Sequence, residues 1–334
     1  MGTIVQRIEL KLDVTGSIDL PGRLEIAATA FLPGPKAMPE RPIGIFAFPG
    51  GGYSRGYFDL HFPGHQGYSE AEFHVAQGFI YVALDHLGVG ESSVTALDTL
   101  RIEDIARAND AAVRQLFALI ECGELAENFP AVPNLFKVGT GQSMGAGMTI
   151  LMQGRHRTYD AIAPMGYSAI HTVLPQRTEA ERLRGIAGHG RSAGRNADPT
   201  KLSMLESSQS TADYMYPFHW EDVPKDILDA DMAGGYPIRT NPPKWGSATI
   251  PNCVITMMSP GFVAEEAAAI DVPVLMAMGE RDTCPNPQAE PSAFKIAKDV
   301  SVFVVPQMAH MHNFASTRQQ LWVRFNDWAR MASR

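Results

Sequence analysis

Apolar residues gather along the chain in short runs that are typical of β-strands. Most of these runs are bounded by glycine or proline, the pattern of a strand buried on both faces. The first two runs are separated by Gly16 and by Pro21-Gly22, which predicts an opening β-hairpin. The sequence therefore predicts about eight strands, at residues 5–14, 23–32, 43–48, 79–84, 135–140, 159–166, 271–278 and 300–305.

Several of these strands are separated by stretches in which apolar residues have helical spacing. Between residues 103 and 122, apolar side chains recur every three or four positions, which predicts a helix packed on a sheet. Further helices are predicted at 68–77, directly after Ser143, and at 317–331. Because strands that alternate with helices favour a mainly parallel sheet covered on both faces, the expected fold class is a doubly wound α/β sheet.

The alternation of strands and helices stops between residues 168 and 270. This stretch contains a short charged helix candidate at 178–186 and a loop rich in Gly, Ser and Asn at 188–198. The α/β pattern resumes after it. The sequence therefore predicts a core formed by residues 1–167 and 271–334, with residues 168–270 inserted after the sixth strand as a cap.

The motif Gly141-Gln142-Ser143-Met144-Gly145 joins a strand-like run to a small, helix-compatible run. Ser143 therefore lies where a strand turns sharply into a helix, the position of a nucleophile elbow. Such a turn strains the backbone at the serine, and the flanking glycines avoid collisions with the neighbouring strand and helix. The motif is common by itself, so its meaning depends on the rest of the chain.

Other turns that follow predicted strands also carry chemistry. The loop 49–53, Pro-Gly-Gly-Gly-Tyr, lets backbone N–H groups approach a ligand closely. Asp282 ends the turn Gly-Glu-Arg-Asp after the seventh strand, and His310 follows the last strand. With Ser143 before both, and with the turn Asp-His-Leu-Gly-Val-Gly-Glu-Ser at 85–92, the chain resembles the α/β-hydrolase superfamily in order and placement. The resemblance covers nearly the whole chain outside the predicted cap.

The resemblance implies a catalytic triad of Ser143, Asp282 and His310. A serine hydroxyl is a poor nucleophile at neutral pH, so His310 would take its proton, while Asp282 would fix the tautomer of the imidazole. His312 is an alternative base, but side chains two residues apart in an extended loop point in opposite directions, so only one histidine would face the serine. Glu280 is an alternative acid, but the family turn has its acid three residues after the glycine, which favours Asp282.

The resemblance also implies an oxyanion hole. The N–H group of Met144, with one from Gly51 or Gly52, would stabilise the negative oxygen of the tetrahedral intermediate. Many lipases and esterases carry His before these glycines, whereas this chain carries Pro49. The choice between the two glycines therefore stays open.

A serine at the elbow argues against the haloalkane dehalogenases and epoxide hydrolases of this superfamily, which use aspartate there. We expect a serine hydrolase that cleaves a carboxylic ester or lactone through an acyl-enzyme. The loop 49–53 together with residues 85–93 also resembles capped bacterial lactonases that open macrocyclic lactones such as zearalenone. Two alternatives are a carbon–carbon bond hydrolase acting on ring-cleavage products and a non-catalytic binding protein on the same scaffold.

The aromatic and methionine residues of the predicted cap form either cap core or the lining of a substrate pocket. As lining, they favour an apolar or aromatic substrate. The residues predicted to bind substrate are Tyr53, Gln142, Tyr216, Phe218 and Trp220.

The net charge of the chain argues against nucleic acid and membranes as partners and leaves a small-molecule substrate as the expected partner. The formal net charge of -8 gives no basic surface for nucleic acid or an anionic membrane. The chain start has no secretory signal, and three scattered cysteines fit reduced thiols, so we expect a cytoplasmic protein. A homodimer is the expected oligomer. No metal is expected at His61 and His65, because Pro63-Gly64 between them would disrupt a metal-binding helix. No cofactor is expected either.

Overall fold

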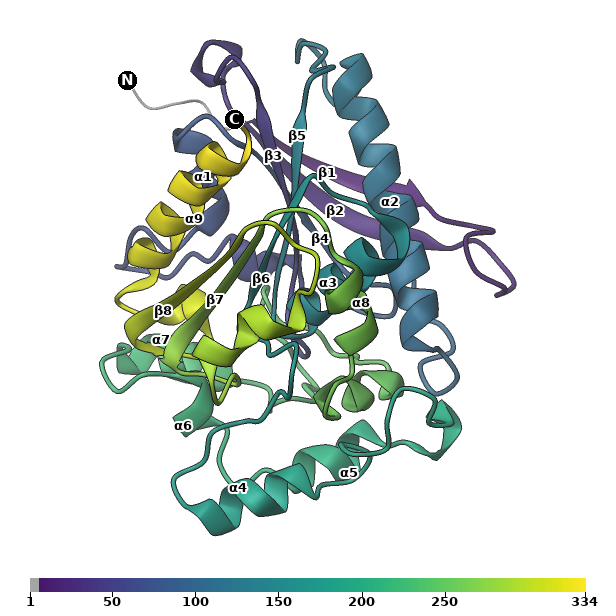
Figure 1. Cartoon of the computed structure of the whole chain (residues 1–334), viewed down its shortest axis with the longest axis vertical. Coiled ribbons are helices and arrows are strands. Elements are labelled where there is room, and N and C mark those ends of the chain that lie inside the picture. The colour runs from purple at the N-terminus through teal and green to yellow at the C-terminus, as the bar shows by residue number, and fades with distance from the viewer. Residues whose placement is uncertain (1–5) are drawn as a thin grey trace.

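One eight-stranded sheet forms the centre of the computed structural model, which describes residues 6–334 (Figure 1). The strand order is β1-β2-β4-β3-β5-β6-β7-β8; β1 pairs antiparallel with β2 and β2 with β4, and the later pairings are parallel. The mainly parallel doubly wound sheet is therefore confirmed. The strands are β1 (Gln6–Asp13), β2 (Glu25–Leu32), β3 (Ile43–Phe48), β4 (Ile80–Leu84), β5 (Phe136–Gln142), β6 (Ala161–Met165), β7 (Val274–Arg281) and β8 (Val300–Ala309).

Residues 1–5 lie outside the described part of the chain. They include the first residue of the predicted opening hairpin and most of the segment in which no secretory signal is recognised. The expected absence of a secretory signal therefore stays a prediction.

Alternating side chains of the strands build a separate apolar core on each face of the sheet. In β3, Phe46 and Phe48 enter one core, whereas Ile43, Ile45 and Ala47 enter the other. Burial on both faces explains why this strand is apolar without interruption.

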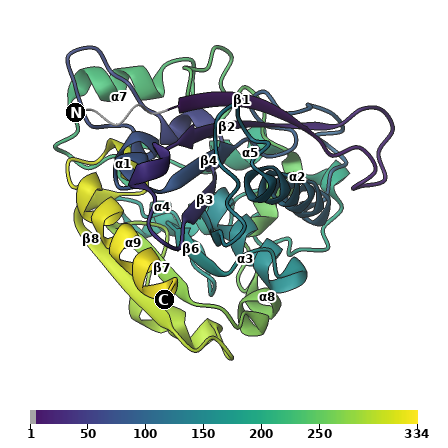
Figure 2. The same ribbon diagram turned by 90° about the horizontal axis from the view of Figure 1, so that it is seen from above.

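Helices cover both faces of the sheet, as Figure 2 shows from above. Apolar residues of α2, α3 and α8 join the core on one face, and those of α1 and α9 join the core on the other. The predicted helices before and after the inserted segment are thereby confirmed. The helices are α1 (Glu70–Ala76), α2 (Ile102–Cys122), α3 (Met144–His156), α4 (Glu179–Ile186), α5 (Met204–Gln209), α6 (Met215–Phe218), α7 (Lys225–Met232), α8 (Ala264–Ala269) and α9 (Arg318–Ala332).

Residues 168–270 leave the sheet after β6 and return to it at β7. All of them are described, and they form α4 to α8 with connecting loops and no strand of the sheet. Helices α4, α5 and α6 lie beyond the carboxyl ends of the parallel strands (Figure 1). Helix α8 differs because it packs on α3: a Cβ atom on Gly154 would lie 2.6 Å from the Cα atom of Glu266. The last helix of this segment therefore covers the sheet rather than the strand ends.

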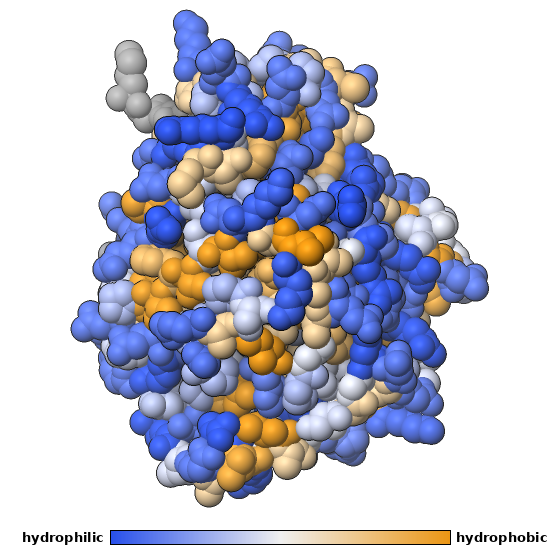
Figure 3. Space-filling view, viewed as in Figure 1, coloured by the Kyte–Doolittle hydropathy of each residue, from blue (hydrophilic) through white to orange (hydrophobic). Residues whose placement is uncertain are grey.

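The face of the molecule shown in Figure 3 is mainly hydrophilic, with groups of exposed hydrophobic residues between the hydrophilic ones. On α4 and α5, Leu183 and Leu205 are 53% and 56% exposed. Among the helices of residues 6–334, none combines the length and the apolarity needed to cross a bilayer.

Candidate active site

Ser143 lies at the turn between β5 and α3, so the predicted strand-to-helix turn is confirmed. Its φ of 55° and ψ of −114° place it in a conformation that residues other than glycine rarely adopt. The turn is held by hydrogen bonds from Ser143 N–H to Met165 O (2.9 Å) and from Gly147 N–H to Ser143 O (3.1 Å). The serine is therefore fixed at the end of the sheet and at the start of a helix.

The glycines on both sides of Ser143 are required by close backbone contacts. A Cβ atom on Gly145 would lie 2.0 Å from Phe48 O, and one on Gly141 would lie 2.3 Å from the Gly145 carbonyl carbon. Both obstacles are backbone atoms of the sheet and helix, which have little freedom to move. Only glycine lets β3, β5 and α3 approach closely enough to form this turn.

Asp282, which follows β7 directly, accepts hydrogen bonds from two histidines. Its Oδ1 lies 2.6 Å from His310 Nδ1, and its Oδ2 lies 2.6 Å from His312 Nε2. The backbone N–H groups of Thr283 and Gly279 donate to Oδ1 (2.6 Å) and Oδ2 (2.9 Å). Burial alone would raise the pKa of Asp282, but the two histidines hold that pKa well below its usual range. The carboxylate is therefore ionised and fully hydrogen-bonded at neutral pH.

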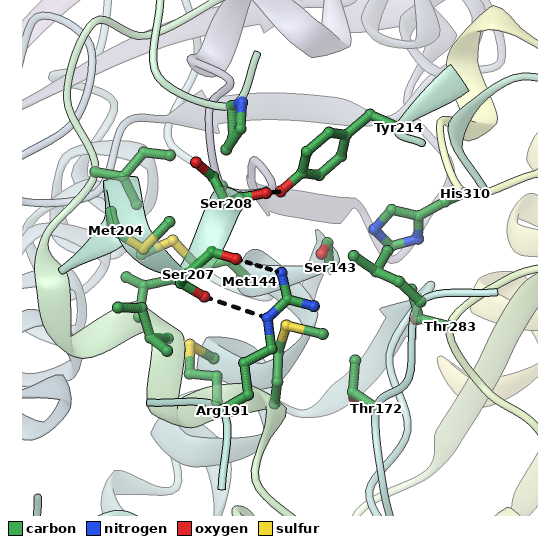
Figure 4. A pocket seen from close by; sticks show the side chains of 18 of the residues that line it. Ser143, Met144, Thr172, Arg191, Met204, Ser207, Ser208, Tyr214, Thr283 and His310 are labelled. Carbon is green, nitrogen blue, oxygen red and sulfur yellow. Dashed lines mark hydrogen bonds between the residues drawn. The ribbon is translucent and has the colours of Figure 1, made fainter. Parts of the chain in front are cut away.

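His310 and Ser143 line the same cavity, and Figure 4 shows the imidazole beside the serine. Because Asp282 accepts from Nδ1, Nε2 is the ring nitrogen that can take a proton. Gln142 Nε2 lies 3.3 Å from His310 Nε2 and donates to His310 O at 2.8 Å. Among the described residues, no hydrogen bond joins the Ser143 hydroxyl to His310; such catalytic bonds are often loose before substrate binds.

His312 occupies the opposite side of the same carboxylate. It is buried, it does not line the cavity with Ser143, and its Nδ1 has no hydrogen-bond partner among the described residues. Of the two histidines, His310 is thus the one placed beside the serine. The sequence indicated that only one of them would face Ser143, but not that both would bind Asp282.

The glycine loop after β3 is held from two sides. Behind it, His86 Nε2 donates to Pro49 O (2.9 Å); burial lowers the pKa of His86 to about 4, so this histidine is neutral. In front of it, the Tyr236 hydroxyl donates to Gly51 O (3.0 Å). Gly52 O accepts from a backbone N–H of the inserted segment at 3.0 Å. Of the three glycines, only Gly51 lines the cavity.

The cavity has a volume of about 110 Å³ and lies between the strand ends and the inserted segment. Gly51, Ser143, Met144 and His310 line it from the core, and apolar side chains of the inserted segment form much of the opposite wall. These apolar residues include Met204, Phe218, Ile250, Val254, Ile255, Met257 and Met258.

Comparison with solved structures identifies this architecture. A soluble variant of monoglyceride lipase from Saccharomyces cerevisiae superposes with a TM-score of 0.61 at 14% identity, covering 94% of each chain. A thermophilic esterase from Thermogutta terrifontis gives 0.59 at 15% identity, covering 98% of this chain and all of that one. A haloalkane dehalogenase variant from Bradyrhizobium elkanii gives 0.59 at 14% identity, covering 98% and 97%.

The chain has the α/β-hydrolase fold. No protein-family model matches the sequence, and no curated protein matches it. The resemblance to zearalenone-type lactonases therefore stays a prediction.

Of the five predicted substrate-binding residues, only Phe218 lines the cavity. Tyr53 is fully buried, and its hydroxyl donates to Asp231 (2.7 Å). Gln142 is buried, and its side chain donates to His310 O. Tyr216 and Trp220 turn their rings toward the Arg281 guanidinium, at 4.0 and 4.6 Å. These four residues thus do not line the cavity.

Besides Ser143 and His310, eight polar residues line the cavity, and sequence reasoning assigned none of them to the site: Tyr167, Thr172, Arg191, Ser207, Ser208, Tyr214, Tyr236 and Thr283. Tyr214 belongs to an aromatic group that the sequence left open between cap core and lining. Arg191 and Tyr236 lie in stretches rich in glycine that resemble solvated loops, and no spacing signals their burial. Thr283 directly follows Asp282, so its position next to the predicted acid was the available signal.

The remaining candidates for acid and metal sites lie apart from the cavity. Glu280 is exposed and accepts from the Gln307 N–H (3.0 Å), so it does not reach His310. His61 and His65 contact different carboxylates, those of Asp59 (2.9 Å) and Asp226 (2.8 Å). One surface group, Asp59 with His61 and Glu72, has ligand atoms within 4.8 Å of one another. Its Asp59 oxygens already accept from protein donors, so it forms a surface hydrogen-bond network.

Proposed function

We propose that this protein is a serine hydrolase that cleaves a carboxylic ester or lactone through an acyl-enzyme. The observation that carries the proposal is the 2.6 Å contact between Asp282 and His310 at a cavity that also contains Ser143, held at a strained turn. An ionised carboxylate on Nδ1 leaves the Nε2 lone pair of the imidazole available as a base.

In the proposed reaction, Ser143 Oγ attacks the carbonyl carbon of the substrate while its proton moves to His310 Nε2. The protonated imidazole, stabilised by Asp282, then gives that proton to the leaving alcohol oxygen as the carbon–oxygen bond breaks. Water attacks the acyl-enzyme in the second half, with His310 again as the base, and the acid product leaves with Ser143 regenerated.

The negative oxygen of the tetrahedral intermediate would be stabilised by two backbone N–H groups. Met144 is the first residue of α3, so its N–H has no acceptor within the helix and carries the positive end of the helix dipole. For the second donor we choose Gly51 over Gly52, because Gly51 lines the cavity. Loss of one such donor typically costs about 3 kcal/mol in barrier height.

Residues 168–270 would act as the cap that closes the apolar cavity over Ser143. Its largely apolar wall favours a substrate with an apolar or aromatic body. We further expect a protein without a cofactor that works as a homodimer in the cytoplasm.

The proposal is tested by hydrolysis of 4-nitrophenyl butyrate together with labelling by a fluorophosphonate. The wild-type protein should release nitrophenol and become labelled at Ser143. Ser143→Ala and His310→Ala should each abolish turnover while the circular dichroism spectrum is retained. No turnover and no label in the wild-type protein would favour a binding role, and full activity in His310→Ala would overturn the assigned base.

A further inference from the structure

The cavity that contains Ser143 also contains a buried cation, Arg191. Only 5% of this residue is exposed, although it lies in a loop after α4. Its guanidinium donates four hydrogen bonds: Nε to Ser207 Oγ (3.2 Å), Nη2 to Ser207 O (3.1 Å) and Thr211 Oγ1 (2.7 Å), and Nη1 to Gly185 O (3.2 Å). All four acceptors are uncharged.

No carboxylate of the described residues forms an ion pair with Arg191. Other arginines of the described residues have different partners. Arg318 is also buried without a carboxylate; it donates to backbone carbonyls of Gln66, Gly67 and Ala315 and lies apart from the cavity. Arg239 is paired with Asp231 (3.3 Å), Arg55 with Asp85 (2.6 Å), and Arg195 with Glu266 (2.9 Å). Burying a charge without a counter-charge is costly. Of the two buried arginines without a carboxylate partner among the described residues, Arg191 is the one that lines the cavity with Ser143.

The charge of Arg191 persists despite its burial. Loss of hydration lowers the pKa of Arg191, but a guanidinium remains protonated in proteins. A guanidinium has five N–H donors, of which four are used by the protein, so one N–H on Nη1 has no acceptor among the described residues. The site therefore offers a positive charge and a free donor.

The guanidinium lies where a bound substrate would meet it. Figure 4 shows Arg191 reaching into the cavity, with Ser207 on one side of its guanidinium and Ser143 and His310 on the other. Apart from Arg191, the charged or titratable side chains that line this cavity are His310 and three tyrosines, Tyr167, Tyr214 and Tyr236. A ligand group that neutralised Arg191 would thus have to come from the substrate.

We propose that Arg191 binds a carboxylate on the substrate, so that the enzyme prefers esters with an apolar body and a carboxylate remote from the scissile bond. This inference rests on the proposed serine hydrolase activity, and it names the substrate class of that activity. The carboxylate would accept a hydrogen bond from the free N–H of Nη1, and its negative charge would compensate the buried positive charge of Arg191. The acceptors on Ser207 and Thr211 would hold the guanidinium in place for it.

The test uses 4-nitrophenyl monoesters of dicarboxylic acids of increasing chain length, each paired with the fatty-acid ester of equal length. The series samples the unknown distance between carbonyl and carboxylate. At the best length, kcat/KM of the wild-type protein should be about 10- to 100-fold higher for the anionic ester, the size expected of a charge-assisted hydrogen bond. In Arg191→Met, this ratio should fall to about one or lower; Arg191→Lys, which keeps the charge, should retain part of it.

Arg184→Met is the matched control, because Arg184 is exposed on α4 and its loss removes the same formal charge nearby. Its ratio should equal that of the wild-type protein. The inference is overturned if the wild-type protein shows no anionic preference at any length, or if Arg191→Met lowers both kcat/KM values equally. If neither series is hydrolysed and Ser143 is not labelled, the proposed function itself fails.

Discussion

In an Asp282→Asn variant, an NH₂ group replaces one carboxylate oxygen without a change in size. Each oxygen accepts one imidazole N–H and one backbone N–H: Oδ1 from His310 and Thr283, Oδ2 from His312 and Gly279. A backbone N–H can only donate, so the amide nitrogen meets an unsatisfiable donor at either position. The buried site has no arrangement of the amide that satisfies all four donors.

Leaving a buried donor unpaired costs about 1–3 kcal/mol, so we expect the free energy of unfolding of Asp282→Asn to fall by about that amount at pH 7. The pKa of Asp282 is depressed in the folded protein, so its stabilising effect is fully present above the unfolded pKa of about 4. It is lost as the pH falls toward the folded pKa. The stability difference between the two proteins, measured by urea unfolding, should therefore shrink below about pH 4.

The loss of catalytic activity in Asp282→Asn, expressed as a free energy, should exceed the loss in the free energy of unfolding. An amide nitrogen facing His310 Nδ1 forces the ring proton onto Nε2, where it blocks proton transfer from Ser143. The comparable loss in a protease with this triad is about 10⁴-fold in kcat, or about 5 kcal/mol. We expect a similar loss in kcat/KM for 4-nitrophenyl butyrate. Glu280→Gln is the matched control, because it makes the same chemical change on an exposed acid. If Asp282→Asn stays within tenfold of wild-type activity, the assigned acid is wrong.

Three further substitutions test the support of the site. His312→Phe removes one of the four hydrogen-bond donors to Asp282, and we expect kcat to fall about tenfold. Complete loss of activity in this variant would contradict that expectation. Tyr236→Phe removes the hydrogen bond to Gly51 O; kcat should fall about 2- to 12-fold, from about 0.5–1.5 kcal/mol, with KM nearly unchanged. Gly145→Ala should lower the free energy of unfolding by about 1–3 kcal/mol, measured by urea unfolding, and a variant of wild-type stability would contradict the steric argument.

The strands and the turn at Ser143 could be predicted because their signals are local. A strand buried on both faces is apolar along its length, as in β3, and this pattern is visible without knowledge of its neighbours. The glycines of the motif reflect close backbone contacts that any side chain would prevent. Asp282 and His310 follow from their positions directly after strands, since parallel strands bring their carboxyl ends to one edge of the sheet.

Residues whose role depends on burial in a loop could not be predicted. Arg191 lies in a stretch of Gly, Ser and Asn that has the composition of a solvated loop, and its burial arises from contacts with Ser207 and Thr211 further along the chain. Tyr53 directly follows the three glycines of the loop 49–53, a position that predicted a place in the cavity. Its hydroxyl instead donates to Asp231, a partner 178 positions away. Long-range polar contacts of this kind leave no periodicity in the sequence.

The contacts of Asp231 link the inserted segment to the glycine loop. This fully buried carboxylate accepts from the Tyr53 hydroxyl (2.7 Å), from His219 Nε2 (2.9 Å) and from Trp245 Nε1 (2.8 Å). Tyr53 belongs to the glycine loop, whereas the other two donors belong to the inserted segment. The Ser54 N–H adds a bond to Trp245 O at 2.8 Å. Because one carboxylate binds donors from both parts, it links the position of the inserted segment, which would select the substrate, to that of the loop that would bind the oxyanion.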